Sequence, residues 1–415
     1  WNVMKVFYRA PEVNNQNLHS RYYFYACLSI VVGILTQDFF KIPSTLGLIA
    51  IGLTWIFSFS FKEKFQALFS QPLAIVMMLF YLLHLISMAY TENTSVGWND
   101  LLLKTSLFLL PLFITSTFFI SNHKRFQVLK VFALLMMFMA ASDIILSSIR
   151  YIETSRSEVF FYMELTHFLP RQPHYVSWYY SFAVFIASHQ VLTNQGKKFW
   201  WLAGMVLLLI SLVLLSSRIF YIAFVLVFTV STFKLFNANL LSKSRLRLLI
   251  LGTSFFLLCI LMIPNTSSRI IDAKNEFESF VGVSSKHTNP RAHLWNHGIQ
   301  LILKKPILGY GVGDARGLLT KSFEGNKSDF FKNNHNFHNQ YLQSWAEVGI
   351  LGVLFLIVLM MMPSLQKNQH PLFLIFLGLT LIGFLTESML ERQAGVIFFA
   401  FMYPLLSGFK SEDLK

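Results

Sequence analysis

Repeated apolar runs of about 20 residues constrain the fold of this chain more than any other feature of its sequence. A helix of that length spans the hydrocarbon core of a bilayer, which is about 30 Å thick. Of the 415 residues, 54% are hydrophobic and only 13% are charged. A soluble domain carries about 25% charged residues, so this chain cannot cover a water-facing surface of its size. We therefore predict an all-α, polytopic membrane protein.

The apolar runs predict about twelve transmembrane helices in a single integral membrane domain that covers residues 1–415. The predicted spans are residues 22–37, 45–61, 72–90, 101–120, 128–149, 174–192, 200–215, 219–236, 248–263, 341–362, 372–386 and 394–407. Most loops assigned to the inside are short and carry Lys or Arg, as the positive-inside rule expects. This alternation places both termini inside and the long polar segment 265–338, between the ninth and tenth spans, outside.

The formal net charge of +14 raises the possibility of nucleic-acid binding. A nucleic-acid binder gathers its basic residues on one domain, whereas here they are spread over the short loops between spans. We therefore expect membrane lipids, and no nucleic acid, among the partners. Cys27 and Cys259 both lie inside apolar runs. We expect them to be small core residues, with neither a disulfide framework nor a metal cluster.

The long external segment ends in a polar motif, His335-Asn336-Phe337-His338-Asn339-Gln340, directly before the tenth span. His338 is the candidate general base, because neutral imidazole accepts a proton near neutral pH. His335 competes for this role, and Asn339 and Gln340 could orient the ring or bind a sugar hydroxyl. The alternative is that His338 is a structural residue just before the start of a membrane helix.

Two arginines are candidate anion-binding residues. Arg218 follows Ser216-Ser217 at the junction of two apolar spans, with almost no loop around it. A charged side chain near hydrocarbon costs at least ~2.5 kcal/mol, so Arg218 either snorkels to lipid headgroups or clamps an anion in a cavity. Arg291 follows Pro290 at the start of an amphipathic run, where helix N–H groups also favour an anion. The alternative for Arg291 is a solvated side chain.

Other polar groups of the external face could support the same ligand. His167, Arg171 and His174 belong to a second, shorter external loop, residues 150–173 and its border with the sixth span. Glu387 and Arg392 flank the last external turn and could also belong to the site, and the alternative for them is a simple ion pair. The sequence shows no acidic cluster of the kind that binds a divalent cation, so we expect no metal in the site.

Glycines recur on both sides of the His338 motif. Gly309-Tyr310-Gly311-Val312-Gly313 could bring backbone N–H groups to a phosphate, but it lacks the strand-turn-helix context of nucleotide folds, so we predict a tight turn. Gly349 and Gly352 lie in the tenth span near Glu347. Small residues at such spacing predict close helix packing.

Together these motifs resemble the signature of the O-antigen ligase and polymerase superfamily. His338-Asn339-Gln340-Tyr341-Leu342 continues to Glu347-x-Gly349-x-x-Gly352, and Arg291 with Trp295 precedes Pro306-Ile307-Leu308-Gly309-Tyr310-Gly311. Ser217-Arg218 resembles the other functional arginine of the family. The matching part is about residues 289–353, and the rest agrees in its layout of spans and in the single large external loop.

The resemblance implies a glycosyltransferase of the GT-C type in the bacterial inner membrane, without metal or other cofactor, with its active site and the loop 265–338 facing the periplasm. The donor would be a glycan on undecaprenyl diphosphate. The acceptor would be lipid A-core in a ligase, a second glycan in a polymerase, or a protein in a protein O-oligosaccharyltransferase. Carried over, Arg218 and Arg291 bind the diphosphate, and His338 activates the acceptor hydroxyl.

The chemistry of these residues agrees with that expectation. A lipid diphosphate needs charge stabilisation as it leaves, and two guanidinium groups can supply it. One long and one short external loop favour a ligase over a polymerase, which commonly has two substantial loops. A lipid-linked glycan transporter or flippase is the alternative from another class. The two halves of the sequence lack the matching broken helices that inverted repeats predict.

Overall fold

The computed structural model describes residues 13–58, 60–116, 121–193, 198–237, 290–323, 336–366 and 369–409, with the separate positions 243, 247, 254, 256–258, 260–263 and 271. Every regular element among these residues is a helix, which confirms the predicted all-α class for this part of the chain. The helices that coincide with predicted spans are α1 (Val13–Thr36), α2 (Ile42–Phe57), α4 (Pro72–Ser87), α7 (Asn122–Thr154), α8 (Pro173–Leu192), α9 (Lys198–Leu215), α10 (Arg218–Asn237), α15 (Gln340–Leu365), α16 (Pro371–Gly383) and α17 (Gln393–Ser407). The other described elements are α3 (Phe61–Phe69), α5 (Thr94–Lys104), α6 (Ser106–Thr115), α13 (Pro290–Lys304), α14 (Ala315–Lys321) and the 3-10 turns η1 (Ser157–Phe160) and η3 (Met389–Glu391).

Proline marks the start of several of these helices. Pro43, Pro72, Pro173 and Pro371 stand at the first or second position of α2, α4, α8 and α16. At a helix start the missing N–H of proline costs no hydrogen bond, and its fixed φ already suits the helix. These prolines explain why the predicted starts of the spans agree with the structure to within a few residues.

Four described helices are long and apolar enough to cross a membrane, namely Leu18–Thr36, Asn122–Thr154, Lys198–Leu215 and Gln340–Leu365. The number becomes five if the bent pair α2 and α3 is one span, and α4, α16 and α17 are shorter apolar helices. These helices indicate a polytopic membrane protein, while the number twelve stays a prediction. The predicted span 101–120 is divided at Thr105 into α5 and α6. The predicted span 248–263 lies mostly outside the described residues.

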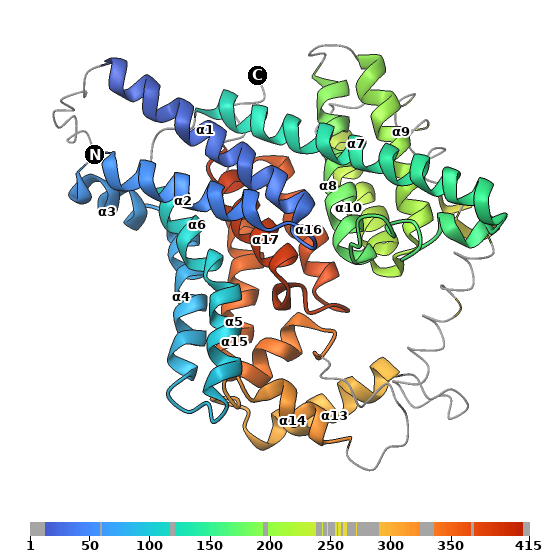
Figure 1. Cartoon of the computed structure of the whole chain (residues 1–415). Helices are drawn as coiled ribbons and strands as arrows, with labels where there is room; N and C mark the ends of the chain where they lie inside the picture. Colours follow the sequence, from blue (N-terminus) through green and yellow to red (C-terminus); the bar gives the residue numbers. More distant parts are fainter. Residues whose placement is uncertain are drawn as a thin grey trace.

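The core is built around α8 and α17, which are buried along nearly their whole length. A helix that is apolar all round is expected inside the bundle, not at its surface. Phe398 of α17 packs against Trp178 and Phe182 of α8 and against Phe376 of α16. Figure 1 shows α16 and α17 in the middle, between α4 and α6 on one side and α8, α9 and α10 on the other.

The bundle has two distinct ends. At one end, aromatic contacts join Phe126 near the start of α7, His189 near the end of α8, His370 before α16 and Phe409 after α17. At the other end, the start of α8 is bonded to the turn between α16 and α17. Tyr175 and Tyr179 there donate their hydroxyl groups to the backbone oxygens of Met389 and Ala394. We call this second end the site end.

Helices α13 and α14 lie within the predicted external segment 265–338 and occupy the lower edge of the view in Figure 1. Their apolar side chains form one cluster with the start of α15, which consists of Leu294, Leu301, Ile302, Ala315, Leu319, Phe323, Phe337 and Ala346. The sequence left open whether this apolar face rests on the bilayer or on the bundle. The structure packs much of it against α15.

Helix α15 is broken at Val348 and Gly349, and the glycine-rich turn fills the break. The N–H groups of Tyr310 and Gly311 donate to the backbone oxygens of Ala346 and Glu347 at 2.8 and 2.9 Å. The turn is therefore tight, as predicted, and these two amides are used inside the protein. Gly349 has φ 73°, and a Cβ there would lie 1.9 Å from the backbone oxygen of Ile307. Gly349 thus allows close packing against a loop and not against another helix, which corrects the prediction.

Candidate active site

Glu387 is the centre of the candidate active site, at the site end of the bundle between α16 and η3. Its side chain is buried and binds three cationic or titratable groups from three separate segments. Arg291, in the first turn of α13, donates to Oε1. Nδ1 of His338, just before α15, lies 3.1 Å from Oε2, and Nε2 of His174, at the start of α8, lies 3.8 Å from the same oxygen. Glu387 therefore brings together three of the residues that the sequence proposed for the site.

The surroundings of Glu387 keep it ionised. Burial by itself would raise the pKa of this carboxyl, but His174, Arg291 and the hydrogen bond from His338 outweigh it and hold the pKa well below its usual range. Glu387 is a carboxylate at neutral pH, so it can accept hydrogen bonds and cannot donate one. Among the described residues, its ion-pair partners are these three and not Arg392, so the alternative of a simple ion pair between Glu387 and Arg392 is wrong.

The contact with Glu387 determines the tautomer of neutral His338. Because a carboxylate only accepts hydrogen bonds, Nδ1 of His338 carries the proton at 3.1 Å from Oε2. Nε2 then carries the lone pair that can accept a proton from a substrate. The side chain of His338 is 23% exposed, so a ligand can reach it. An imidazole oriented by a carboxylate in this way has the arrangement of a general base in hydrolase triads.

The backbone directs the His338 ring toward Glu387. His338 has φ 47°, a left-handed conformation that costs about 1–2 kcal/mol for a residue other than glycine. Its N–H donates to the side chain of Asn336 at 2.9 Å. The preceding residue, Phe337, is bonded on both sides, to Trp295 through its oxygen and to Gln343 through its N–H. These bonds hold an unfavourable backbone conformation at the residue proposed as the base.

Asn339 and Gln340 support the site through the backbone. Asn339 caps α15, with its side-chain oxygen 3.0 Å from the N–H of Leu342, and its amide group donates to the oxygen of Leu385. Gln340 is fully buried, and its side-chain oxygen accepts the N–H of Leu390 at 2.7 Å. Both amides join α15 to the turn that carries Glu387. The suggestion that Gln340 binds a sugar hydroxyl is wrong, because the burial of its side chain leaves no access.

Arg218 is the first residue of α10, and the chain reverses direction between α9 and α10 within two residues. That reversal needs a left-handed residue, and Ser216 supplies it with φ 51°. Phe220, two residues later, packs closely against Gly383 at the end of α16. Gly383 lies four residues before Glu387, so the start of α10 and Glu387 belong to the same end of the bundle.

The remaining candidates take other positions. Arg171 is buried and donates to Asp143 of α7, whose other oxygen accepts the hydroxyl of Tyr180 at 3.1 Å. The described contacts of Arg171 therefore join the short external loop to α7 and do not involve Glu387. His335 lies outside the described residues, as does Cys259, while Cys27 is fully buried as expected.

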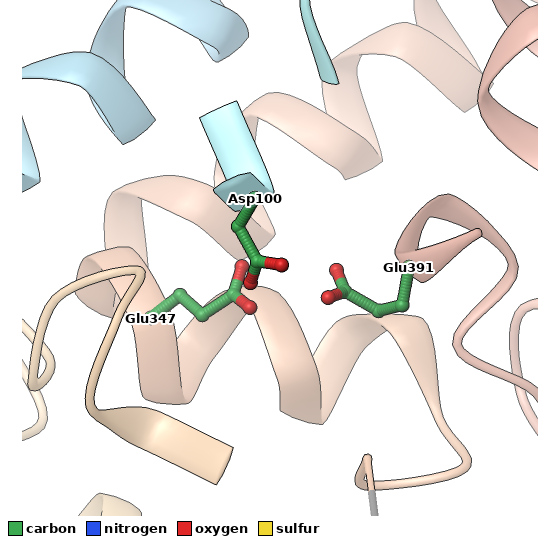
Figure 2. A group of neighbouring side chains, drawn as sticks. All are labelled: Asp100, Glu347 and Glu391. Carbon is green, nitrogen blue, oxygen red and sulfur yellow. The ribbon is translucent and has the colours of Figure 1, made fainter. Parts of the chain in front are cut away.

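A second cluster, next to the Glu387 site, was missed by the sequence analysis. Asp100, Glu347 and Glu391 point toward one another, with ligand-type atoms within 4.8 Å (Figure 2). The statement that the chain has no acidic cluster is therefore wrong. The ammonium group of Lys104 lies 3.0 Å from Glu347 and 2.8 Å from Glu391, where it supplies the positive charge itself. Glu347 and Lys104 both fall inside predicted spans, and charged residues there are expected to be paired, which was the available signal.

A comparison with known families identifies the central part of the chain. A family model described as "O-Antigen ligase" matches residues 203–357. This range contains Arg218, Arg291 and His338, and it ends before Glu387 and Glu391. The match confirms the resemblance that the motifs of the sequence indicated.

A relative from Haemophilus influenzae (strain ATCC 51907 / DSM 11121 / KW20 / Rd) is described as an uncharacterized protein. It is 27% identical over 144 residues, which cover 31% of this chain and 36% of the relative. The alignment thus spans little more than a third of that protein.

Proposed function

We propose that the chain transfers a glycan from undecaprenyl diphosphate to an acceptor hydroxyl, a proposal supported by the match of residues 203–357 to the O-antigen ligase family model. We propose lipid A-core as the acceptor, which makes the chain an O-antigen ligase-type glycosyltransferase. One observation carries the proposal: Arg291 and His338, far apart in the sequence, meet on the buried carboxylate of Glu387. This arrangement provides a cation for the leaving group beside a base for the attacking group.

His338 acts as the general base. Its Nε2 takes the proton from the acceptor hydroxyl as the hydroxyl oxygen forms a bond to the anomeric carbon of the glycan. Glu387 holds the Nδ1–H and stabilises the imidazolium that forms. The bond between the anomeric carbon and the diphosphate oxygen breaks at the same centre, and its electron pair leaves with the diphosphate. Attack from the face opposite the diphosphate inverts the anomeric configuration.

Arg291 and Arg218 bind the diphosphate. A guanidinium has five N–H donors, more than the Glu387 carboxylate accepts, and the Arg291 side chain is 28% exposed. Arg291 can therefore hold Glu387 and donate to phosphate oxygens together. Arg218 stands at the N-terminus of α10, where backbone N–H groups add to the attraction for an anion. Two guanidinium groups make the reaction independent of a divalent cation.

The site end faces the periplasm in the bacterial inner membrane, within a GT-C-like fold of about twelve spans. The opposite end of the bundle supports this orientation. Lys124 and Arg125 lie there at the start of α7, and Arg125 donates to the backbone oxygen of Leu405 at 2.6 Å. Basic residues gather on the cytoplasmic side of membrane proteins.

A transfer assay with purified protein in lipid nanodiscs tests the proposal. The donor is undecaprenyl diphosphate that carries a labelled glycan, and the acceptors are lipid A-core, a second lipid-linked glycan and a serine-rich peptide. We expect the label on lipid A-core with inverted configuration, with or without EDTA. Label on the second glycan would identify a polymerase, and label on the peptide a protein O-oligosaccharyltransferase.

The same preparation tests the alternative from another class. In sealed vesicles without an acceptor, a transporter or flippase moves the labelled lipid across the bilayer and leaves the glycosidic bond intact. Transport of this kind, with no transfer to any of the three acceptors, would overturn the proposed function.

A further inference from the structure

We propose that Lys104 is a positioning residue that fixes His338 and Glu387 relative to each other, an inference that rests on the proposed function. The ammonium group of Lys104 bonds to two buried carboxylates, Glu347 at 3.0 Å and Glu391 at 2.8 Å. Each carboxylate belongs to a different element, Glu347 to α15 and Glu391 to η3. The side chains of all three residues are at most 1% exposed, so water cannot replace these contacts.

The first arm of the network leads from Lys104 to His338. The second oxygen of Glu347 accepts the side-chain N–H of Gln343 at 2.6 Å. The oxygen of the same Gln343 amide accepts the backbone N–H of Phe337 at 3.1 Å. Phe337 directly precedes His338, whose left-handed backbone directs the ring toward Glu387. A displacement of Glu347 would therefore displace the backbone of His338, the proposed base.

The second arm leads from Lys104 to the turn that carries Glu387. Glu391 lies four residues after Glu387, at the end of η3. Arg316 of α14 bonds to the other oxygen of Glu391, so a helix of the external segment braces the turn from the opposite side. Lys104 therefore joins two segments that meet in the active site, the one before α15 and the one after α16.

The balance of charge explains why this network is rigid. Three carboxylates, those of Asp100, Glu347 and Glu391, face two permanent cations, Lys104 and Arg316. His84 lies beside the same cluster. Its Nδ1 lies 2.8 Å from the oxygen of Phe80 and its Nε2 lies 3.3 Å from Glu347, so both ring nitrogens face acceptors.

Lys104, Arg316 and the ring of His84 thus surround the buried carboxylates. Separation of any pair would leave a buried charge without its partner, which is strongly unfavourable. Neither arm can relax independently of the other.

Three single substitutions that each remove one carboxylate charge test the proposal. Glu347→Gln and Glu391→Gln each weaken one arm. Asp143→Asn is the matched control, because Asp143 is an equally charged, buried carboxylate that pairs with Arg171 and belongs to neither arm. We expect each Gln variant to lower kcat at least about tenfold, since small displacements of catalytic groups have effects of this size. The KM for the donor should stay within about threefold of wild type in all three, and kcat of Asp143→Asn likewise.

Amide hydrogen exchange measures the positioning without any activity. We expect faster exchange in segments 336–343 and 384–391 of both Gln variants and of Lys104→Met. Exchange in these segments should be unchanged in Asp143→Asn. It should also be unchanged in Lys64→Met, which removes a lysine that is equally buried but lies on α3.

Wild-type kcat and exchange in both Gln variants would overturn the proposal. An equal loss of kcat in Asp143→Asn would do so as well, because the cluster would then act through general stability. Gln variants that do not fold while Asp143→Asn folds would also contradict it. If the wild-type protein transfers no glycan, the proposed function fails, while the exchange comparison still decides whether the network holds the two segments.

Discussion

Two carboxylates four residues apart, Glu387 and Glu391, have the same chemistry and opposite surroundings. Glu387 faces Arg291 and His338, whose side chains are 28% and 23% exposed. Glu391 faces Lys104, whose side chain is 1% exposed, and Arg316, whose side chain is 19% exposed. The first cluster can exchange contacts with a ligand, whereas the contacts of Lys104 with Glu347 and Glu391 are sealed within the protein. We infer that the exposure of Arg291 and His338, and not the presence of charge, separates a site for chemistry from the support at Lys104.

The Glu387 site and the Lys104 cluster should differ most in their effects on catalysis. His338→Ala should lower the rate of transfer by a factor of about 10²–10⁴, the usual contribution of a general base, and leave folding intact. The measurement is initial rate of transfer from the labelled lipid donor. His297→Ala is the control, since that histidine lies on α13 and packs against the ring of Phe323. Full turnover in His338→Ala would reject its assignment as the base.

For the stability of the fold, we expect the Lys104 cluster to matter more than the Glu387 site. Lys104→Met leaves Glu347 and Glu391 buried without their shared cation, so the free energy of unfolding should fall by about 3–5 kcal/mol. Arg291→Met should lower it by at most about 1 kcal/mol, because Arg291 is partly exposed and two imidazoles remain beside Glu387. Unfolding in mixed micelles with increasing SDS measures both. Equal losses in the two variants would remove the distinction between an open and a sealed cluster.

The pH dependence of stability reports on Glu387 directly. Its pKa is lower in the folded protein than the ordinary value of 4.5, so the ionised form contributes stability above about pH 4.5. This contribution is lost as the pH falls through the lower pKa of the folded state. The difference in stability between wild type and Glu387→Gln should therefore shrink as the pH falls below about 4.5. A difference that grows toward acid would mean that Glu387 is protonated in the folded protein.

We expect the smallest effect from Arg291→Lys. This substitution distinguishes the hydrogen-bonding geometry of the side chain from its charge. Arg291→Lys keeps the positive charge but loses the planar fork that matches phosphate oxygens, so donor affinity should fall about tenfold. The binding constant of the lipid-linked donor measures this change. Lys304→Arg, at the other end of α13, serves as a control for altered charge geometry on the same helix. Wild-type affinity in Arg291→Lys would mean that only the charge matters there.

Most of the helices could be predicted from the sequence, because the residues that determine where a helix starts and ends are neighbours in the chain. Apolar runs, prolines at helix starts and basic loops are all read from neighbouring residues, and α8, α9 and α10 begin and end within two residues of the predicted spans. The break at Thr105 was missed, although Lys104, Thr105 and Ser106 interrupt the apolar run there. The tight turn at Gly311 was predicted, but its partner, the break in α15, was not.

The contacts of Glu387 at the centre of the site could not be predicted from the sequence, for a different reason. Glu387 contacts His338 across 49 residues and Arg291 across 96, and nothing near Glu387 in the chain indicates these partners. Its neighbour Arg392 was the obvious but wrong choice. The Lys104 cluster likewise combines residues of α5, α14, α15 and η3. Candidate residue types can be read from a chain, while the side chains that they meet depend on how the helices pack.

The central claim is that Arg218 and Arg291 serve one diphosphate beside His338, and binding of undecaprenyl diphosphate without a glycan tests it most directly. We expect Arg218→Ala and Arg291→Ala each to raise the Kd at least about tenfold, as the loss of a charge-assisted hydrogen bond predicts, and His338→Ala to leave it unchanged. Wild-type Kd in both arginine variants would contradict the account.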